Sequence, residues 1–491
     1  MLQGLTLYAR STREHRVPGI LAFALYVVIV LLVSWHHEPW RDEADSWLLA
    51  RDASLRQIID VMPYAGTPPL WYLLLFPFAK LGFPYVTQAA LNAVVMIAAA
   101  GLLLFRAPFS LAVKSCFAFS YYLAYEYSVI ARSYGLSVLL IFCLATIWSE
   151  RLSRPLTTGL LILALANTNT HSLLLAGLLF FLFLWDVFTG RLLTRAATVL
   201  GVAIAVLGLC LAFLEVRTPP DASALLLDRP ADFGQPAKAI GEAFFPGFVT
   251  WPFLWLALLL LSLVVLDLWP EWPPLLLLFS YVSLLLYLFV FVWVGGPRHY
   301  GFLLLTVVLV LWIRSPLRRE ADSSEARRLT RAVLTLLVLT CGLFSFSTAV
   351  KSWFREVVLP FSGAEEMARF ISNNRLESRI TAAHFAPHTE SILPYLQNKK
   401  FWYAGLEDFG SFMKWDRDYE AGLNVSYPDA IRRVERRFPP GSEYLLLLGA
   451  ELPQPEQKGY RLLFSTSAEV FGYGVERFFL YEPSTAAISL P

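Results

Sequence analysis

Long apolar stretches recur along most of the chain, and each is close to the length that a helix needs to cross a membrane. A span takes roughly 20 apolar residues, so the shorter stretches must extend into neighbouring residues. The composition agrees, because 57% of the residues are hydrophobic and only 16% are charged, against roughly 25% charged in soluble domains. We therefore predict a polytopic α-helical membrane protein with about eleven spans, at residues 17–35, 86–105, 109–125, 135–149, 155–170, 172–189, 196–214, 250–268, 273–294, 300–313 and 332–350.

The orientation follows from the Lys and Arg residues of the short loops, which concentrate on the inner side of a membrane. If the N-terminus lies inside, the inner loops contain the basic clusters at residues 10–16, 106–114, 151–154, 191–195 and 314–331. One further inner loop, residues 267–274, contains no basic residue. The pattern predicts a multi-pass protein of a bacterial inner membrane. Nucleic acid is not an expected partner, since the basic residues do not share one face.

The segment 68–82 is apolar enough to resemble another span, but counting it as one would place the later basic clusters outside. We therefore predict that it lies flat on the bilayer, with Trp71, Tyr72 and Lys80 at head-group depth. The predicted organisation is a transmembrane domain at 1–350, whose first outer loop at 36–85 contains this juxtamembrane helix. A soluble α/β domain follows at 351–491, on the periplasmic side, where charged residues are common and short helices alternate with short strands.

The first outer loop begins with an unusual group of carboxylates, Asp42, Glu43 and Asp45, directly after the first span. A carboxylate near a low-dielectric boundary is a candidate general base or metal ligand, because burial raises its pKa towards the working range. The residues alone leave an alternative open, in which Asp42 and Glu43 only stabilise a helix N-terminus. Tyr64, in the same loop, is a further candidate for substrate binding.

Three other outer positions contain polar residues that suit an anionic ligand. Arginine binds phosphate through paired hydrogen bonds, and Arg132 lies on the side that the topology leaves poor in basic residues. Each position also has a structural interpretation: an aromatic belt, a tight turn after Gly295, or a structural histidine. The candidates are Glu126, Arg132 and Tyr134 in one loop, Arg298, His299 and Tyr300 in another, and His171 beside Asn167 and Asn169 in a third.

If the spans form a bundle, acidic residues of the first loop face basic residues of the others at the depth of a lipid phosphate. A carboxylate there would deprotonate an acceptor, while the cations neutralise charge on a departing phosphate.

These motifs resemble, in order, those of the GT-C superfamily of integral membrane glycosyltransferases, in the group with the protein O-mannosyltransferases and the lipid A aminoarabinose transferases. The resemblance covers about the first 315 residues. It rests on the Asp42-Glu43 pair, the TPPLWY motif at 67–72, YSVIARSYGL at 127–136, and the polar elements at 169–172 and 298–300.

The resemblance implies an inverting transfer of a sugar from a polyprenyl-phosphate donor to a periplasmic lipid, glycan or protein acceptor, with Asp42 as the catalytic base. Glu43 would assist catalysis, and Arg132, Arg298 and His299 would bind the donor phosphate. Glu126, Tyr134, His171, Tyr64 and Tyr300 would contact substrates. The resemblance leaves metal use open. Mg²⁺ or Mn²⁺ would be held by Asp42, Glu43 and Asp45, although we expect metal-independent transfer.

Other functions of polytopic proteins fit the sequence less well. A transporter of polyprenyl-linked sugars would show inverted repeats and charged residues within its spans. No repeat is evident, and ionisable residues within the spans are nearly absent. An O-antigen polymerase or ligase would concentrate its arginines in one large middle loop. The largest internal outer loop here, residues 215–250, has only Arg217, Arg229 and Lys238. A non-catalytic assembly subunit is a third alternative.

Overall fold

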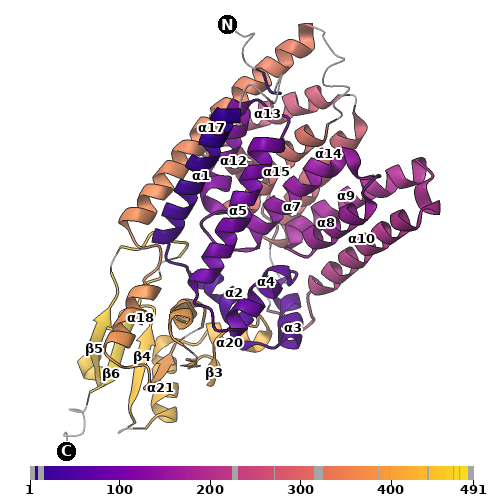
Figure 1. Cartoon of the computed structure of the whole chain (residues 1–491). Coiled ribbons are helices and arrows are strands. Elements are labelled where there is room, and N and C mark those ends of the chain that lie inside the picture. The colour runs from indigo at the N-terminus through magenta and orange to yellow at the C-terminus, as the bar shows by residue number, and fades with distance from the viewer. Residues whose placement is uncertain are drawn as a thin grey trace, which may run out of the picture.

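The computed structural model describes residues 6–8, 16–223, 230–269, 271–314, 325–384, 386–397, 399–439, 442–467, 469–474 and 476–484. The predicted basic residues Arg10 and Arg13, and most of the inner loop at 314–331, lie outside these ranges. Figure 1 shows a bundle of long helices with a small mixed domain at one end. The predicted class, a polytopic helical protein with a C-terminal α/β domain, is confirmed.

Within the described residues, eight helices are long and apolar enough to cross a membrane, and all eight coincide with predicted spans. The π-helical turn η5 (Leu288–Val292) extends one of them, and η3 (Trp148–Glu150) extends another. The eight are α1 (Arg16–His36), α5 (Val86–Arg106), α7 (Ser133–Ile147), α9 (Thr170–Thr189), α10 (Ala196–Glu215), α13 (Trp251–Leu268), α14 (Trp272–Tyr287) and α17 (Glu325–Val358).

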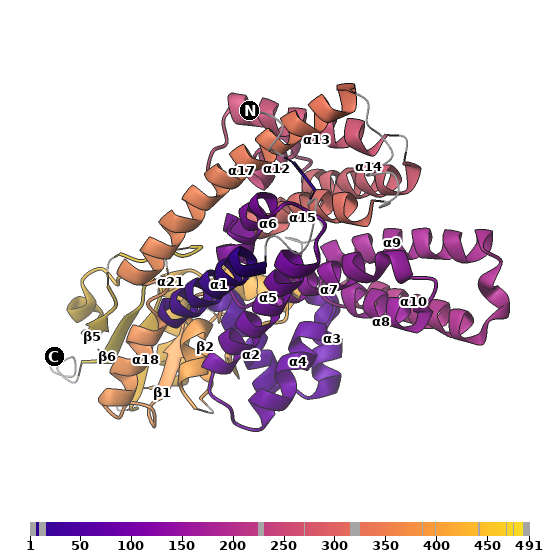
Figure 2. The same cartoon turned by 45° about the horizontal axis from the view of Figure 1, so that its top comes forward.

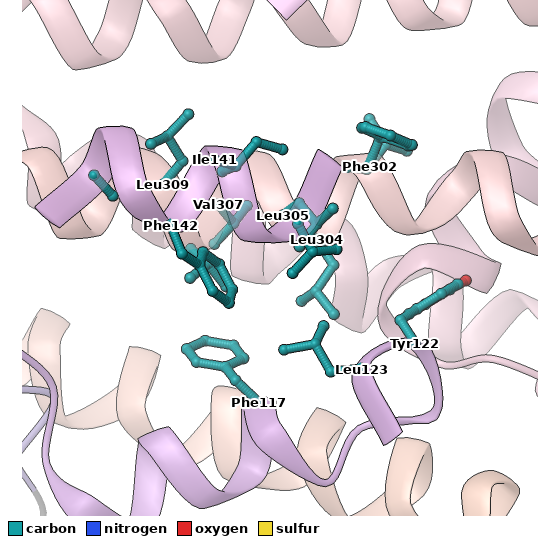
Figure 3. Close-up of a cluster of buried hydrophobic side chains, with 14 of the residues drawn as sticks. Phe117, Tyr122, Leu123, Ile141, Phe142, Phe302, Leu304, Leu305, Val307 and Leu309 are labelled. Atoms are coloured by element: carbon teal, nitrogen blue, oxygen red, sulfur yellow. The ribbon is translucent and has the colours of Figure 1, made fainter. Parts of the chain in front are cut away.

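The other three predicted spans form shorter helices. Residues 109–125 form α6 (Leu111–Ala118) and the π-helical turn η2 (Tyr122–Glu126), while 155–170 and 300–313 correspond to α8 (Pro155–Ala166) and α15 (Pro297–Ile313). Every side chain of α15 from His299 to Trp312 is buried, so this helix forms the centre of the bundle. Figure 3 shows side chains of α15 and α7 facing Phe117 of α6 and Leu123 of η2. The central position of α15 places its first residues in the middle of the bundle end that meets the C-terminal domain.

In Figure 2, α8, α9 and α10 extend together to one side of α7, whereas α13, α14 and α17 lie on the other side of α15. The short 3₁₀ turn η4 (Leu192–Thr194) joins α9 to α10. Helices α8 and α10 approach closely, because a Cβ atom added at Gly159 would lie 2.1 Å from the carbonyl oxygen of Gly201. Small residues at such contacts are typical of helix packing in membranes.

The inner loop without basic residues is neutralised by neighbouring segments. Asp267 forms ion pairs with Arg314 and Arg331, and Glu271 accepts a hydrogen bond of 2.7 Å from Arg314. The Arg314 side chain is almost completely buried in this network. The charge missing from the loop at 267–274 is therefore supplied by the ends of α15 and α17, which places all three on the same side of the membrane.

The first outer loop folds into three short helices, α2 (Arg41–Asp52), α3 (Leu55–Ala65) and α4 (Leu70–Lys80). The 11 residues of α4 are fewer than a span needs, and its position on the membrane surface stays a prediction. Lys80 is exposed, but Trp71 and Tyr72 are buried in a core with Trp47 of α2 instead of facing head groups. The outer loop at 215–250 contains a helix that the sequence did not predict, α12 (Gln235–Phe244), which packs against α15.

The C-terminal domain follows α17, which continues past the predicted boundary at residue 350 to Val358. Its described strands form a six-stranded sheet in the order β3-β2-β1-β4-β6-β5, with β1 parallel to β2 and β4 and the other pairs antiparallel. The strands are β1 (Ile380–Ala383), β2 (Phe401–Tyr403), β3 (Asp408–Gly410), β4 (Tyr444–Leu448), β5 (Tyr460–Ser465) and β6 (Phe479–Pro483).

Each face of the sheet has its own hydrophobic core. One core includes Ala430 and Val434 of α21 (Tyr427–Arg437). The other combines α18 (Ala364–Asn373) and η6 (Glu390–Tyr395) with Ala44 and Leu48 of α2. The first outer loop and the C-terminal domain therefore share a core. The remaining elements are α19 (Ala386–Thr389), α20 (Arg417–Leu423) and η7 (Pro455–Lys458).

Candidate active site

Three helix N-termini meet at the end of the bundle next to the C-terminal domain, and each contributes a charged residue to one cluster. Asp42 lies in the first turn of α2, Arg132 is the N-cap residue of α7, and Arg298 lies in the first turn of α15. The Asp42 carboxylate forms an ion pair with Arg132 and accepts a hydrogen bond of 3.1 Å from Nη2 of Arg298. The structure thus brings the first, second and third sequence candidates together at one point.

The backbone before α15 explains how Arg298 reaches this point. Gly295 has a φ of 75°, a conformation that favours glycine, and Pro297 begins the helix. The Tyr127 hydroxyl donates a hydrogen bond of 2.7 Å to the carbonyl oxygen of Arg298. Nε of Arg298 is buried without a hydrogen-bond partner, so this guanidinium retains a donor for a ligand.

Burial by itself would raise the pKa of Asp42, but the guanidinium groups of Arg132, Arg298 and Arg41 hold it below its usual value. The side chain keeps 20% of its surface exposed, so the carboxylate remains accessible from outside. Burial raises the pKa of the neighbouring Asp45 to about 6, and the charge of Asp42 contributes to this rise. The two carboxyl groups therefore have different protonation behaviour within one helical turn.

Glu43 points away from solvent and connects two loops. Its side chain is fully buried; one oxygen accepts hydrogen bonds from Nε2 of His37 at 2.9 Å and from the backbone of Trp40 at 3.3 Å. The other oxygen accepts from the Ala131 N–H at 2.6 Å. These contacts hold the loop before Arg132 against the start of α2.

Aromatic and imidazole groups line the side of the site next to α9. The Tyr134 hydroxyl lies 2.9 Å from Nε2 of His299, and the Arg132 guanidinium lies over the Tyr134 ring. The His171 and His299 rings stack with centroids 4.8 Å apart. Nδ1 of His299 is buried without a hydrogen-bond partner, which makes this nitrogen available to a ligand.

Other candidates have partners of their own. Glu126 accepts hydrogen bonds of 2.6 Å from both Tyr121 and Tyr473. Tyr300 is buried, and its hydroxyl donates to the carbonyl oxygen of Val294. Tyr64 is hydrogen-bonded to Asp221 and lies under Lys414, at the surface between α3 and the C-terminal domain.

The three carboxylates of the first loop do not form a cation site. Asp42 is paired with arginines, Glu43 is bonded to His37 and backbone N–H groups, and Asp45 accepts from the backbone of Met413 at 3.2 Å. In the parts of the chain that the structure describes, no group of three His, Cys, Asp or Glu side chains is placed to hold a metal ion.

Sequence reasoning missed several residues of the site because their partners are distant in the chain. His37 bridges Glu43 and Glu356 of α17, with 3.0 Å between its Nδ1 and Oε1 of Glu356. Burial opposes protonation of His37, but the two carboxylates raise its pKa well above the usual value. The C-terminal domain adds Tyr473 and Glu476, and the latter accepts a hydrogen bond from the Arg41 backbone at 3.0 Å.

Comparisons with known proteins complete this description. No family model and no curated protein sequence matches the chain. Two solved structures of ArnT from Cupriavidus metallidurans are similar in fold at 11% sequence identity. The structure bound to undecaprenyl phosphate has a TM-score of 0.55, with 96% of this chain and 99% of that chain covered. The apo structure has a TM-score of 0.57, with 96% and 98% covered. The chain therefore shares the fold of these ArnT structures over 96% of its length, which exceeds the roughly 315 residues of the sequence resemblance.

Proposed function

We propose that the protein is an inverting glycosyltransferase that takes a sugar from a polyprenyl-phosphate donor at the outer face of a bacterial inner membrane. The observation that carries the proposal is the pairing of the Asp42 carboxylate with Arg132 and Arg298 at one end of a bundle of apolar helices. A base and two phosphate-binding cations are thereby placed within reach of one substrate. The similar ArnT structure bound to undecaprenyl phosphate supports a donor of this class.

In the proposed reaction, an acceptor hydroxyl attacks the anomeric carbon of the donor while the bond from that carbon to the phosphate oxygen breaks. Asp42 accepts the hydroxyl proton, and polyprenyl phosphate departs with the bonding electrons. Arg132 and Arg298 neutralise the charge that develops on the leaving phosphate, and His299 donates a hydrogen bond to it. The free N–H of Arg298 and the unpartnered Nδ1 of His299 suit this role.

Donor binding also prepares the base in this scheme. Without a ligand, the two arginines lower the pKa of Asp42, which makes its carboxylate a weak proton acceptor. A phosphate bound between Arg132 and Arg298 would compensate their charge and compete for their N–H groups. The pKa of Asp42 then rises only when the donor is present, and the base becomes active when there is a sugar to transfer.

The other candidates have supporting roles in this proposal. Glu43 fixes the distance between Asp42 and Arg132 through its hydrogen bond from the Ala131 N–H. Tyr134, His171 and Glu126 shape the sugar-binding side, whereas Tyr300 positions α15 from within the core and Tyr64 meets the acceptor at the surface. The C-terminal domain lies on the outer side, where it borders the path of an acceptor lipid, glycan or protein.

The proposal is tested with the purified protein in liposomes, by following sugar release from a radiolabelled panel of polyprenyl-phosphate sugars in the presence of a cell-envelope extract. We expect wild-type protein to consume at least one donor and Asp42→Asn to consume none, although the variant inserts and melts like wild type. Arg217→Ala, an exposed cation of an outer loop, serves as the matched control and keeps its activity. Near-normal turnover by Asp42→Asn would exclude Asp42 as the base.

A further inference from the structure

The connection between β5 and β6 leaves the sheet and packs on the linker after α17. The Phe471 N–H donates to the carbonyl oxygen of Pro360 at 3.2 Å, and the Gly472 N–H donates to that of Phe361 at 3.1 Å. A Cβ atom at Gly472 would lie 2.4 Å from the Phe361 carbonyl oxygen, so the contact requires glycine. The rings of Phe471 and Phe361 lie 5.1 Å apart. These contacts fix the residue that follows, Tyr473.

Tyr473 reaches from the C-terminal domain into the candidate active site. Its hydroxyl donates a hydrogen bond of 2.6 Å to Oε2 of Glu126, and it lies 3.3 Å from the hydroxyl of Tyr121. Its ring packs against Trp40, with centroids 5.3 Å apart. The Arg298 guanidinium carbon lies 5.8 Å from the Tyr473 ring centroid and 5.6 Å from that of Trp40.

The arrangement limits the orientations that Arg298 can adopt. Long side chains lose considerable rotamer entropy when a ligand fixes them, and two aromatic rings against the guanidinium reduce that loss before binding. Each cation–π contact contributes modestly in water and more when the groups are shielded from solvent. The Glu126 carboxylate, hydrogen-bonded to two tyrosines, fixes the Tyr473 ring in turn.

We infer that Tyr473 is a positioning residue through which the C-terminal domain holds Arg298 for the donor phosphate. The inference rests on the proposed function, since it takes Arg298 as a phosphate ligand. The inference also gives the C-terminal domain a role, because the domain then contributes a residue, Tyr473, to the donor site. The Tyr473 ring holds the Arg298 guanidinium, and the Tyr473 hydroxyl fixes that ring through its hydrogen bond to Glu126.

The experiment measures binding of undecaprenyl phosphate to the purified full-length protein in detergent by microscale thermophoresis. We expect Tyr473→Leu to weaken binding about fivefold, as the loss of one shielded cation–π contact predicts, and Tyr473→Phe to stay within about twofold of wild type. Phe409→Leu, which removes an exposed aromatic ring from β3 of the same domain, is the matched control and should bind like wild type. Tyr473→Met repeats the test if the leucine variant does not survive purification.

A double-mutant comparison separates positioning from general packing. If Tyr473 acts through Arg298, Tyr473→Leu weakens binding in the wild-type protein but adds nothing to Arg298→Ala. An equal loss in both backgrounds, or wild-type affinity of Tyr473→Leu while Arg298→Ala binds weakly, would overturn the inference and leave the proposed function intact. Unchanged binding by Arg298→Ala would instead remove Arg298 from the donor site and overturn both.

Discussion

Oε1 of Glu43 lies 2.6 Å from the backbone nitrogen of Ala131. Each of these residues is the neighbour of a proposed functional residue, Asp42 in one case and Arg132 in the other. The hydrogen bond therefore fixes the distance between the base and one of its cations. Because the Glu43 carboxylate is completely buried and also bonded to His37, the contact is shielded from competition by water.

Glu43→Gln should lower both stability and activity. The amide has only one acceptor oxygen, so either the Ala131 N–H or the His37 ring N–H loses its acceptor. Leaving a buried donor unpaired lowers the free energy of unfolding by about 1–3 kcal/mol. Thermal unfolding and donor turnover are measured together. Asp42→Asn is the comparison, since it should lose turnover alone. A wild-type melting temperature for Glu43→Gln would show that this contact does not organise the site.

Substitutions at Arg298 should affect donor affinity more than the fold. Arg298→Ala removes a charge-assisted contact to phosphate, typically about 1.5–3 kcal/mol, which corresponds to a rise in donor KM of roughly tenfold to a hundredfold. Arg298→Lys keeps the charge but loses the forked geometry, so its KM should be intermediate. Steady-state kinetics with varied donor test both, and an unchanged donor KM in Arg298→Ala would contradict the assignment.

The positions of the eight long apolar helices could be derived from sequence because they depend on composition, which is a local property. The loop at 267–274 was the weak point, since it contains no basic residue. Its partners Arg314 and Arg331 lie in other segments, and a rule that counts charges within one loop does not detect them. The short helix α12 was missed because its apolar face packs against α15 rather than lipid, and its 10 residues do not resemble a span.

The site was predictable where chemistry alone restricts the residue type. An arginine on the outer side, such as Arg132, and a carboxylate directly after a span, such as Asp42, are both costly without a function or a partner. The sequence does not reveal that Glu43 faces inward, because it shares a helical turn with Asp42. Tyr473 and Glu476 were unpredictable for another reason, since their contacts depend on how the C-terminal sheet docks on α2.

The close approach of α8 and α10 should not tolerate larger residues. A Cβ atom at Gly201 would lie 2.3 Å from the carbonyl oxygen of Pro155, which is backbone and has little freedom to move. Gly201→Ala should therefore lower stability by about 1–3 kcal/mol, as overpacking does elsewhere. Gly177→Ala on α9, where no atom lies within 4 Å of the added carbon, is the matched control. Thermal unfolding in detergent distinguishes them, and equal melting temperatures would contradict the close contact.

Glu476 should make stability depend on pH. Burial raises the pKa of its carboxyl group to about 7, although hydrogen bonds from Ser362 and the Arg41 backbone oppose the rise. The folded protein therefore retains a proton that the unfolded chain releases near pH 4.5. The contribution of this proton to stability is complete below that pH and is lost as the pH rises towards about 7, by at most about 1.4 kcal/mol per pH unit.

Glu476→Gln removes this titration while keeping the shape of the side chain. Relative to wild type, the variant should gain stability as the pH is raised from 5 to 8, because the wild-type carboxyl group must then ionise in a buried position. The measurement is the difference in melting temperature between the two proteins across that range. Glu482→Gln is the control: hydrogen bonds and charges from Arg461 and Arg379 outweigh the effect of burial and lower the pKa of Glu482, so it does not titrate between pH 5 and 8. A constant difference between wild type and Glu476→Gln would show that Glu476 keeps one protonation state throughout.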